Sequence, residues 1–312
     1  MPVSPLQQVL RAFKIQRKRV PKFGPYKVAG SAKRLAERRL VAVVRELVRV
    51  LETDAMALLP QTRVDADPLP DVRGVLNSRT TLYTRRAQAQ IDPILQEGER
   101  EQRGAEKRVV SPLGLDVLGS EPWLKKELAS RGKDFSELCV DLTRETERRI
   151  ASAALETLEK GRPREWLRRQ IREAGGIEER RAKFIARDQV GKLQGALHEN
   201  RQRDLGIDSY IWRNSRDERV AGNPNGAYPD PDSESTTHGN HWEREGRRFL
   251  WTKSGGRLVE VLSDGKTRAT EFADGHPGDP IQCRCFAEPV IAGLEDLQQL
   301  DREAPIAREY KG

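Results

Sequence analysis

Five residues whose side chains bind soft metal ions occur in the last quarter of the chain. His276, Cys283 and Cys285 lie in the stretch G-H-P-G-D-P-I-Q-C-R-C, and His238 and His241 lie upstream. Thiolate sulfur and imidazole nitrogen are ligands that Zn²⁺ prefers, and a structural zinc ion takes four ligands in a tetrahedron. Only Arg284 separates the two cysteines, whereas zinc-binding cysteine pairs are usually separated by about two to four residues. The residues therefore predict either a zinc site or two packed thiols.

Composition narrows the class of protein. Only 36% of the residues are hydrophobic and 33% are charged, which favours long solvated helices over one large core. No apolar run is long enough to span a membrane, and the start M-P-V-S-P-L-Q-Q lacks the order of a secretory signal. Three cysteines cannot form a disulfide framework. We therefore expect a protein of a reducing compartment with neither a membrane span nor a classical secretory signal.

Positive charge is concentrated at the amino terminus. Residues 1–49 hold thirteen Lys and Arg against two Glu, whereas the net charge of the whole chain is +8. Such an arm attracts polyanions by neutralising phosphates and releasing counterions, so it suits nucleic acid or an acidic protein surface. The residues expected to make these contacts are Arg11, Lys14, Arg17, Lys18, Arg19 and Lys22.

The pattern up to residue 160 is helical. Apolar residues recur at the helical period from Ser31, which could serve as the N-cap, to about Leu59. Further polar helices are predicted at about 75–103 and 121–159. Because neither is apolar enough to be buried on all sides, we expect elongated bundle packing without a self-sufficient core.

Two shorter helices are predicted next. Pro163 can begin the first, and the glycines at 175 and 176 can end it before a second helix at 177–205. Arg187 and Asp188 on the second helix are expected to pin it to the strands that follow. His198 is expected to lie at or near the surface.

After residue 206 the apolar period changes from about 3.6 to 2, which indicates strands. The predicted strands are 207–214, a three-stranded antiparallel meander at 249–252, 258–262 and 267–272, and a last strand at 285–291. Residues 216–240 are predicted to form a long surface insert. The predicted fold is α+β: an elongated, mostly helical amino-terminal region followed by a small carboxy-terminal α+β domain with an antiparallel sheet. Its parts are a basic extended arm (1–30), a helical region (31–160), the α+β domain (161–293) and a polar tail (294–312).

An ordered series of segments resembles a known family. The segments are R-A-K-F-I-A-R-D-Q (181–189), L-G-I-D-S-Y-I-W-R-N-S (205–215), D-E-R-V (217–220), H-W-E-R-E-G-R-R-F (241–249) and G-H-P-G-D-P-I-Q-C-R-C (275–285). The series is similar to the head-morphogenesis domain of Mu F-like minor head proteins of tailed phages, and the similarity covers about residues 160–291. It rests on Arg187, Asp188, Trp212, Asp217, Arg219, His241, His276, Cys283 and Cys285. Two loops depart from the family pattern, one between D-E-R-V and His241 and one between H-P-G and C-R-C.

The resemblance implies a structural protein of the virion, made in the cytoplasm of a bacterial host and located inside the phage head. It would associate with the portal protein and with capsid or scaffold proteins, and would act in head morphogenesis and in DNA packaging or ejection. The basic arm, inferred from charge alone, agrees with non-specific binding of double-stranded DNA. On this interpretation the chain is not an enzyme, and zinc held by His241, His276, Cys283 and Cys285 would be structural.

An enzymatic alternative stays open on the sequence alone. A His/Cys metal site beside Asp217, Glu218 and Glu243 could activate water in a metal-dependent nuclease or another hydrolase. Against this alternative, the chain has no H-E-x-x-H, no H-x-E paired with P-C-x-x-C, no G-x-S-x-G and no phosphate-binding glycine loop.

Overall fold

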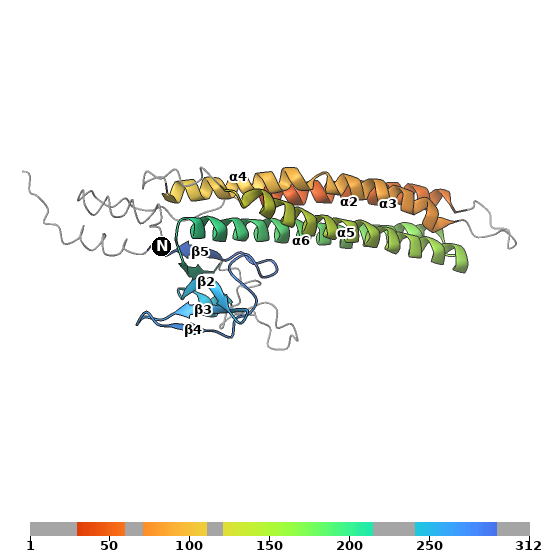
Figure 1. Cartoon of the computed structure of the whole chain (residues 1–312). Helices are drawn as coiled ribbons and strands as arrows, with labels where there is room; N and C mark the ends of the chain where they lie inside the picture. Colours follow the sequence, from red (N-terminus) through yellow and green to blue (C-terminus); the bar gives the residue numbers. More distant parts are fainter. Residues whose placement is uncertain (1–29, 60–70, 111–120, 215–240, 292–312) are drawn as a thin grey trace, which may run out of the picture. The chain divides into compact units, whose positions relative to one another are not determined.

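The structure of the chain is a computed structural model that describes residues 30–59, 71–110, 121–214 and 241–291 (Figure 1). It confirms the predicted α+β class, because long helices are followed by a five-stranded antiparallel sheet. None of the described helices is long and apolar enough to cross a membrane. Several predicted features lie outside the described residues: the arm with its contacts Arg11, Lys14, Arg17, Lys18, Arg19 and Lys22, the insert with Asp217 and Arg219, and the polar tail.

Two compact units make up the chain. The helical unit comprises residues 30–98 and 125–193, and the mixed unit comprises the described parts of residues 99–124 and 194–312. Helices α4 (Ile91–Val110) and α6 (Arg164–Asp204) contribute residues to both units, and the sheet belongs to the mixed unit alone.

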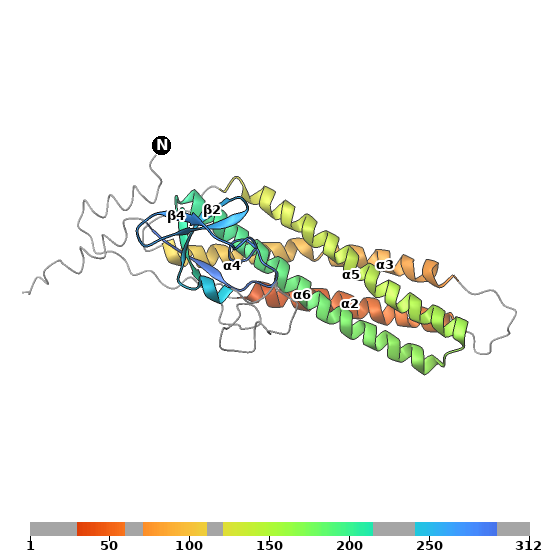
Figure 2. The same ribbon diagram turned by 90° about the horizontal axis from the view of Figure 1, so that it is seen from below.

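The helical unit has a hydrophobic core of its own. Helices α2 (Ser31–Ala57), α3 (Val72–Gln88), α5 (Leu124–Lys160) and the first part of α6 run alongside one another (Figures 1 and 2). Their facing sides bury residues that include Leu47, Leu51, Ala55, Leu76, Tyr83, Ile150, Ala154, Leu158, Leu167 and Ile171. The expectation that these helices lack a self-sufficient core is therefore wrong. A narrow apolar stripe on each helix is enough to form a hydrophobic core when four such stripes face one another.

Helices α2 and α5 confirm the helices predicted at 31–59 and 121–159 to within a few residues. The predicted N-cap at Ser31 is wrong, because Ser31 is already helical and Gly30 precedes the helix in the left-handed conformation, with φ 74°. Glycine adopts this conformation without the strain that a Cβ would cause.

The single helix predicted at 75–103 is instead two helices, α3 and α4, with a turn at 89–90. Helix α3 begins earlier than predicted because the Asp71 carboxylate accepts a hydrogen bond from the Gly74 amide at 2.9 Å. Pro93 stands in the first turn of α4, where a missing N–H costs little. Apolar spacing reveals neither the Asp71 cap that begins α3 nor the interruption that precedes Pro93 at the start of α4.

Helix α6 is continuous from Arg164 to Asp204, so the break predicted at Gly175 and Gly176 is wrong. Gly175 serves packing instead. A Cβ on it would lie 3.2 Å from Val48 Cγ1 on α2, closer than ordinary contact. Glycine here lets two helices approach rather than ending one of them.

Of the polar pair on α6 that was expected to attach the helix to the strands, Arg187 contacts another helix instead. Arg187 pairs with Glu37 of α2 at 3.1 Å, and Asp188 pairs with Lys192 of α6 itself at 2.8 Å. All four residues belong to the helical unit. Arg187 therefore holds α6 to α2.

The sheet confirms the predicted strands and meander. It consists of β1 (Ser209–Arg213), β2 (Arg248–Ser254), β3 (Arg257–Val261), β4 (Thr267–Ala269) and β5 (Phe286–Pro289), in the spatial order β4-β3-β2-β1-β5. Every neighbouring pair is antiparallel, and Trp212 of β1 lies opposite Ala287 of β5. The core beside the sheet contains Tyr210, Trp212, Phe249, Trp251, Leu258, Phe272, Cys283, Cys285 and Ala287.

Candidate metal centre

Three of the four predicted ligands come together in the mixed unit. The ligand atoms of His241, Cys283 and Cys285 all lie within 4.8 Å of one another, and all three side chains are buried. Nδ1 of His241 is 3.8 Å from Sγ of Cys283 and 3.4 Å from Sγ of Cys285. One nitrogen and two sulfur atoms at this spacing could hold a metal ion, and a soft or borderline ion such as Zn²⁺ suits them best.

Local structure explains why a spacing of one residue works here. Cys283 and Cys285 immediately precede β5, and Arg284 between them is exposed while both cysteines are buried. In extended chain, side chains two residues apart point to the same side. The C-R-C spacing therefore delivers two thiols to one face, whereas a helical or turn-based zinc motif would need a longer interval.

Charges within the cluster favour a deprotonated sulfur. The hydrogen bond with Cys285 and the neighbouring His241 hold the pKa of the Cys283 thiol well below its usual range, although burial opposes them. Burial lowers the pKa of His241, but its hydrogen bonds with Asp274 and Cys283 outweigh burial and raise that pKa. A thiolate is the form of cysteine that binds metal ions.

An acidic residue orients the His241 ring. Nε2 of His241 lies 3.2 Å from Oδ2 of Asp274, whose Oδ1 accepts a bond from Nη2 of Arg244 at 2.7 Å. The Arg244 guanidinium is buried between two aromatic rings, 4.7 Å from the centre of Trp212 and 4.2 Å from that of Phe272. A proton on Nε2 facing Asp274 leaves the Nδ1 lone pair directed at the sulfurs, as second-shell carboxylates do in metal sites. The sequence alone does not reveal the roles of Asp274 and Arg244, because neither residue belongs to a pattern typical of metal ligands.

His276 does not join the cluster, so its prediction as the fourth ligand is wrong. Its Nδ1 instead forms a hydrogen bond with the Tyr210 hydroxyl at 2.9 Å. Gly275 and Gly278 flank it with φ values of 112° and 104°, which turn the imidazole toward the aromatic core. Burial lowers the pKa of His276 to about 4, so the ring is neutral near pH 7. The H-P-G part of the motif packs the core, and the C-R-C part faces His241.

The loop that contains His276, Pro277 and Gly278 packs against α6 at Gly195. A Cβ placed on Gly195 would be 2.8 Å from the Pro277 carbonyl oxygen and 3.0 Å from Cα of Gly278. Real Cβ atoms almost never approach backbone this closely, so only glycine fits unless the loop moves. Gly195 thus seats the loop that leads to the two cysteines.

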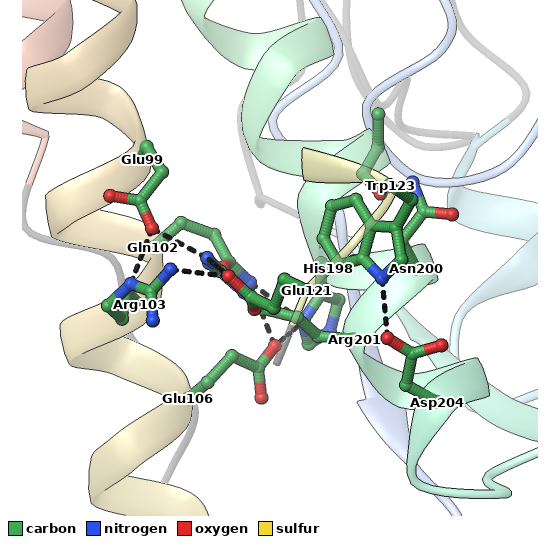
Figure 3. A network of polar contacts seen from close by, with 11 residues as sticks. Glu99, Gln102, Arg103, Glu106, Glu121, Trp123, His198, Asn200, Arg201 and Asp204 are labelled. Atoms are coloured by element: carbon green, nitrogen blue, oxygen red, sulfur yellow. Dashed lines mark hydrogen bonds and ion pairs between the residues drawn. The ribbon is translucent and has the colours of Figure 1, made fainter. Parts of the chain in front are cut away.

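A polar network links α4, α6 and β5 within the mixed unit (Figure 3). His198, expected near the surface, is buried: Nδ1 contacts the Glu106 carboxylate and Nε2 donates to the Ala287 carbonyl oxygen at 2.7 Å. The Gln202 amide donates to the same carbonyl at 3.3 Å and accepts from the Trp251 indole at 2.9 Å. The network therefore fixes β5, and with it the segment that carries the cysteines.

A buried arginine completes the network. The Arg201 side chain, 1% exposed, donates from Nε to Oε1 of Glu121 at 2.6 Å and from Nη2 to Oε1 of Glu99 at 2.7 Å. Arg103 contacts both of these carboxylates as well (Figure 3). His198, Arg201 and Gln202 continue the apolar stripe of α6 by one turn, which is the only signal in the sequence that could have revealed their burial.

Comparison with known proteins adds one distant relative. The chain is similar to an uncharacterized protein of Haemophilus influenzae, with 29% identity over 164 residues. The aligned part covers 52% of this chain and 28% of that protein, so the chain spans little more than a quarter of the relative's length. No protein-family model matches the chain, and no solved structure matches it.

Proposed function

We propose that this chain is a minor head protein of a tailed phage that acts in head morphogenesis and in DNA packaging or ejection. Its partners are the portal protein, capsid or scaffold proteins, and double-stranded DNA bound without sequence preference. It resides inside the head after assembly in the bacterial cytoplasm. The ordered series of motifs between residues 181 and 285 carries the proposal. Its support in the fold is that His241 and the C-R-C pair, far apart in the series, meet in one cluster.

The metal ion in this proposal is a structural Zn²⁺ held by His241, Cys283 and Cys285, with its fourth tetrahedral position filled by a ligand other than these three residues. Burial supports the structural role: these side chains are 3%, 5% and 8% exposed. Catalytic zinc needs an open position that substrate can reach, whereas structural zinc is enclosed by protein. Asp274, the carboxylate that contacts His241, is also engaged by Arg244 and is thus not free to serve as a general base.

Loss of the gene should affect the phage head. We expect particles from a phage lacking this protein to be defective in DNA content or infectivity, and the chain to co-purify with its own phage's portal protein when the two are co-expressed. Infectivity titres and DNA content per particle measure the first outcome, and affinity purification measures the second. Unchanged titres from the deletion phage, or hydrolysis of nucleic acid by the purified chain, would favour the enzyme alternative.

The basic arm should dominate DNA binding. The purified chain is expected to bind duplex DNA of any sequence, with log K falling steeply as log salt concentration rises, by about 0.9 for each phosphate contacted. Deleting residues 1–30 should make this slope shallower by about 5, if each of the six contact residues neutralises one phosphate. Deleting the tail 294–312, which carries more acidic than basic residues, is the control. An unchanged slope after deletion of the arm would assign DNA binding to the rest of the chain.

A further inference from the structure

A shallow groove runs along α2 and α6 in the helical unit. Its volume is about 350 Å³. The residues that line it are Arg34, Glu37, Arg38, Val41, Ala42 and Arg45 of α2, and Lys183 of α6. Val41 is buried, so Ala42 is the only exposed apolar residue among those that line the groove. Charged side chains therefore supply the polar groups of the groove, and Ala42 and the aliphatic stems of those side chains supply its apolar surface.

The two carboxylates at the groove each form an ion pair with an arginine. Glu37 pairs with Arg187 at 3.1 Å, and Glu179, the neighbouring carboxylate on α6, pairs with Arg45 at 2.8 Å. The Arg45 hydrogen bond lowers the pKa of Glu179, so this carboxylate stays ionised and continues to balance Arg45. Each anion at the groove thus has its own guanidinium.

Three cations are left in excess. Arg34 and Arg38 are exposed and form no ion pair with another described residue, and Lys183 adds a third positive charge from the facing helix. These side chains converge on one groove rather than spreading over the surface. Positive charge that no nearby carboxylate balances attracts anions from solution.

We propose that this groove binds successive phosphates of one strand of duplex DNA. The proposal deepens the proposed function, because it assigns part of the DNA contact to a folded surface. Residues 34 and 45 are separated by eleven residues of helix, about 16 Å at 1.5 Å per residue. One strand turns fully around the duplex in about 34–36 Å, so a straight row of this length faces only the few neighbouring phosphates that lie on one side of the duplex. The planar arginine fork suits phosphate oxygens.

The surface chemistry favours DNA over an acidic protein. Protein interfaces have an apolar, often aromatic, centre, whereas DNA interfaces are more polar and strongly positive. The groove offers one exposed alanine and no aromatic residue among its lining side chains. The basic tract 1–29 also precedes α2 in the sequence.

The test compares two triple variants of the full chain. Arg34→Gln, Arg38→Gln and Lys183→Gln together remove the excess charge of the groove. Arg73→Gln, Arg85→Gln and Arg172→Gln remove three exposed charges elsewhere in the helical unit and serve as the matched control. We expect the groove variant to bind duplex DNA at least about tenfold more weakly, with a slope of log K against log salt shallower by about 2.7. The control should differ little from wild type.

Two outcomes would overturn the proposal. In one, the groove variant retains the wild-type slope, or loses no more than the control. In the other, it keeps its DNA affinity but loses binding to polyglutamate, which would assign the groove to an acidic protein. Equal melting temperatures of the two variants establish that folding is intact. Portal co-purification and the phenotype of the deletion phage do not depend on this result, so failure of the groove and failure of the proposed function are distinguishable.

Discussion

Serine at positions 283 and 285 is expected to abolish zinc binding and to lower the melting temperature. Chain purified without chelator should contain about one zinc ion, and the double variant Cys283→Ser, Cys285→Ser should contain none. A ligand present at about a thousand times its Kd contributes about 4 kcal/mol of stability, which corresponds to roughly 8–16 °C for a protein of this size class. Elemental analysis and calorimetry measure the two effects.

Two further variants distinguish ligation from packing. Cys139→Ala should retain zinc, because Cys139 is buried in the helical unit, where burial raises the pKa of its thiol to about 12. Asp274→Asn should bind zinc about 10- to 100-fold more weakly while retaining all three ligands, as expected for a carboxylate that orients a ligating imidazole. If wild-type chain contains no metal and chelator leaves its melting temperature unchanged, the cysteines are packing residues.

Replacing Arg201 with methionine is expected to destabilise the mixed unit by about 3–5 kcal/mol. The change keeps much of the side-chain volume but removes the guanidinium that bonds Glu121 and Glu99. The Glu121 side chain is only 4% exposed, so it would keep a buried charge with less compensation. Denaturation in urea, followed by tryptophan fluorescence of the sheet, measures the loss.

The neighbouring Arg203 supplies the control for this prediction. It pairs with Glu199 at 3.0 Å, but half of its side chain is exposed, so Arg203→Met should cost less than about 1 kcal/mol. Adding Glu121→Gln to Arg201→Met should restore part of the stability, because the buried charge that Arg201 no longer balances is then gone. Equal costs for the two methionine variants would mean that the buried network contributes little.

The spacing of apolar residues along the sequence predicted most of the secondary structure. The change from a period of 3.6 to a period of 2 near residue 206 correctly predicted helices before it and an antiparallel meander after it. The errors fall where local chemistry competes with periodicity. A glycine, a residue that usually ends helices, serves close packing at Gly175. A capping aspartate begins α3 earlier than the apolar pattern, and a proline stands in the first turn of α4, after the turn that separates it from α3.

Only part of the candidate site was predicted, because residue types identify metal ligands but do not show which distant residues contact them. Residue types identified His241, Cys283 and Cys285, and the alternation of extended chain makes the short cysteine spacing workable. His276 shares the motif but not the cluster, because left-handed glycines on both sides turn it toward Tyr210. The roles of Asp274, Arg201 and His198 depend on contacts between residues distant in sequence, which no spacing rule on one chain encodes.

The contact between His198 and the Ala287 carbonyl has a consequence for how the protein meets other proteins. Strands β4 and β5 are the two edges of the sheet, and an open edge invites a strand from another molecule to pair with it. At β5, His198 and Gln202 already occupy the Ala287 carbonyl, and Pro289 has no N–H to donate. At β4, the edge is only three exposed residues long and carries Arg268, which pairs with Glu260. Strand addition is therefore disfavoured at both edges, so protein partners are expected to contact side chains of the helices and loops, and edge-to-edge aggregation is resisted at high local concentration.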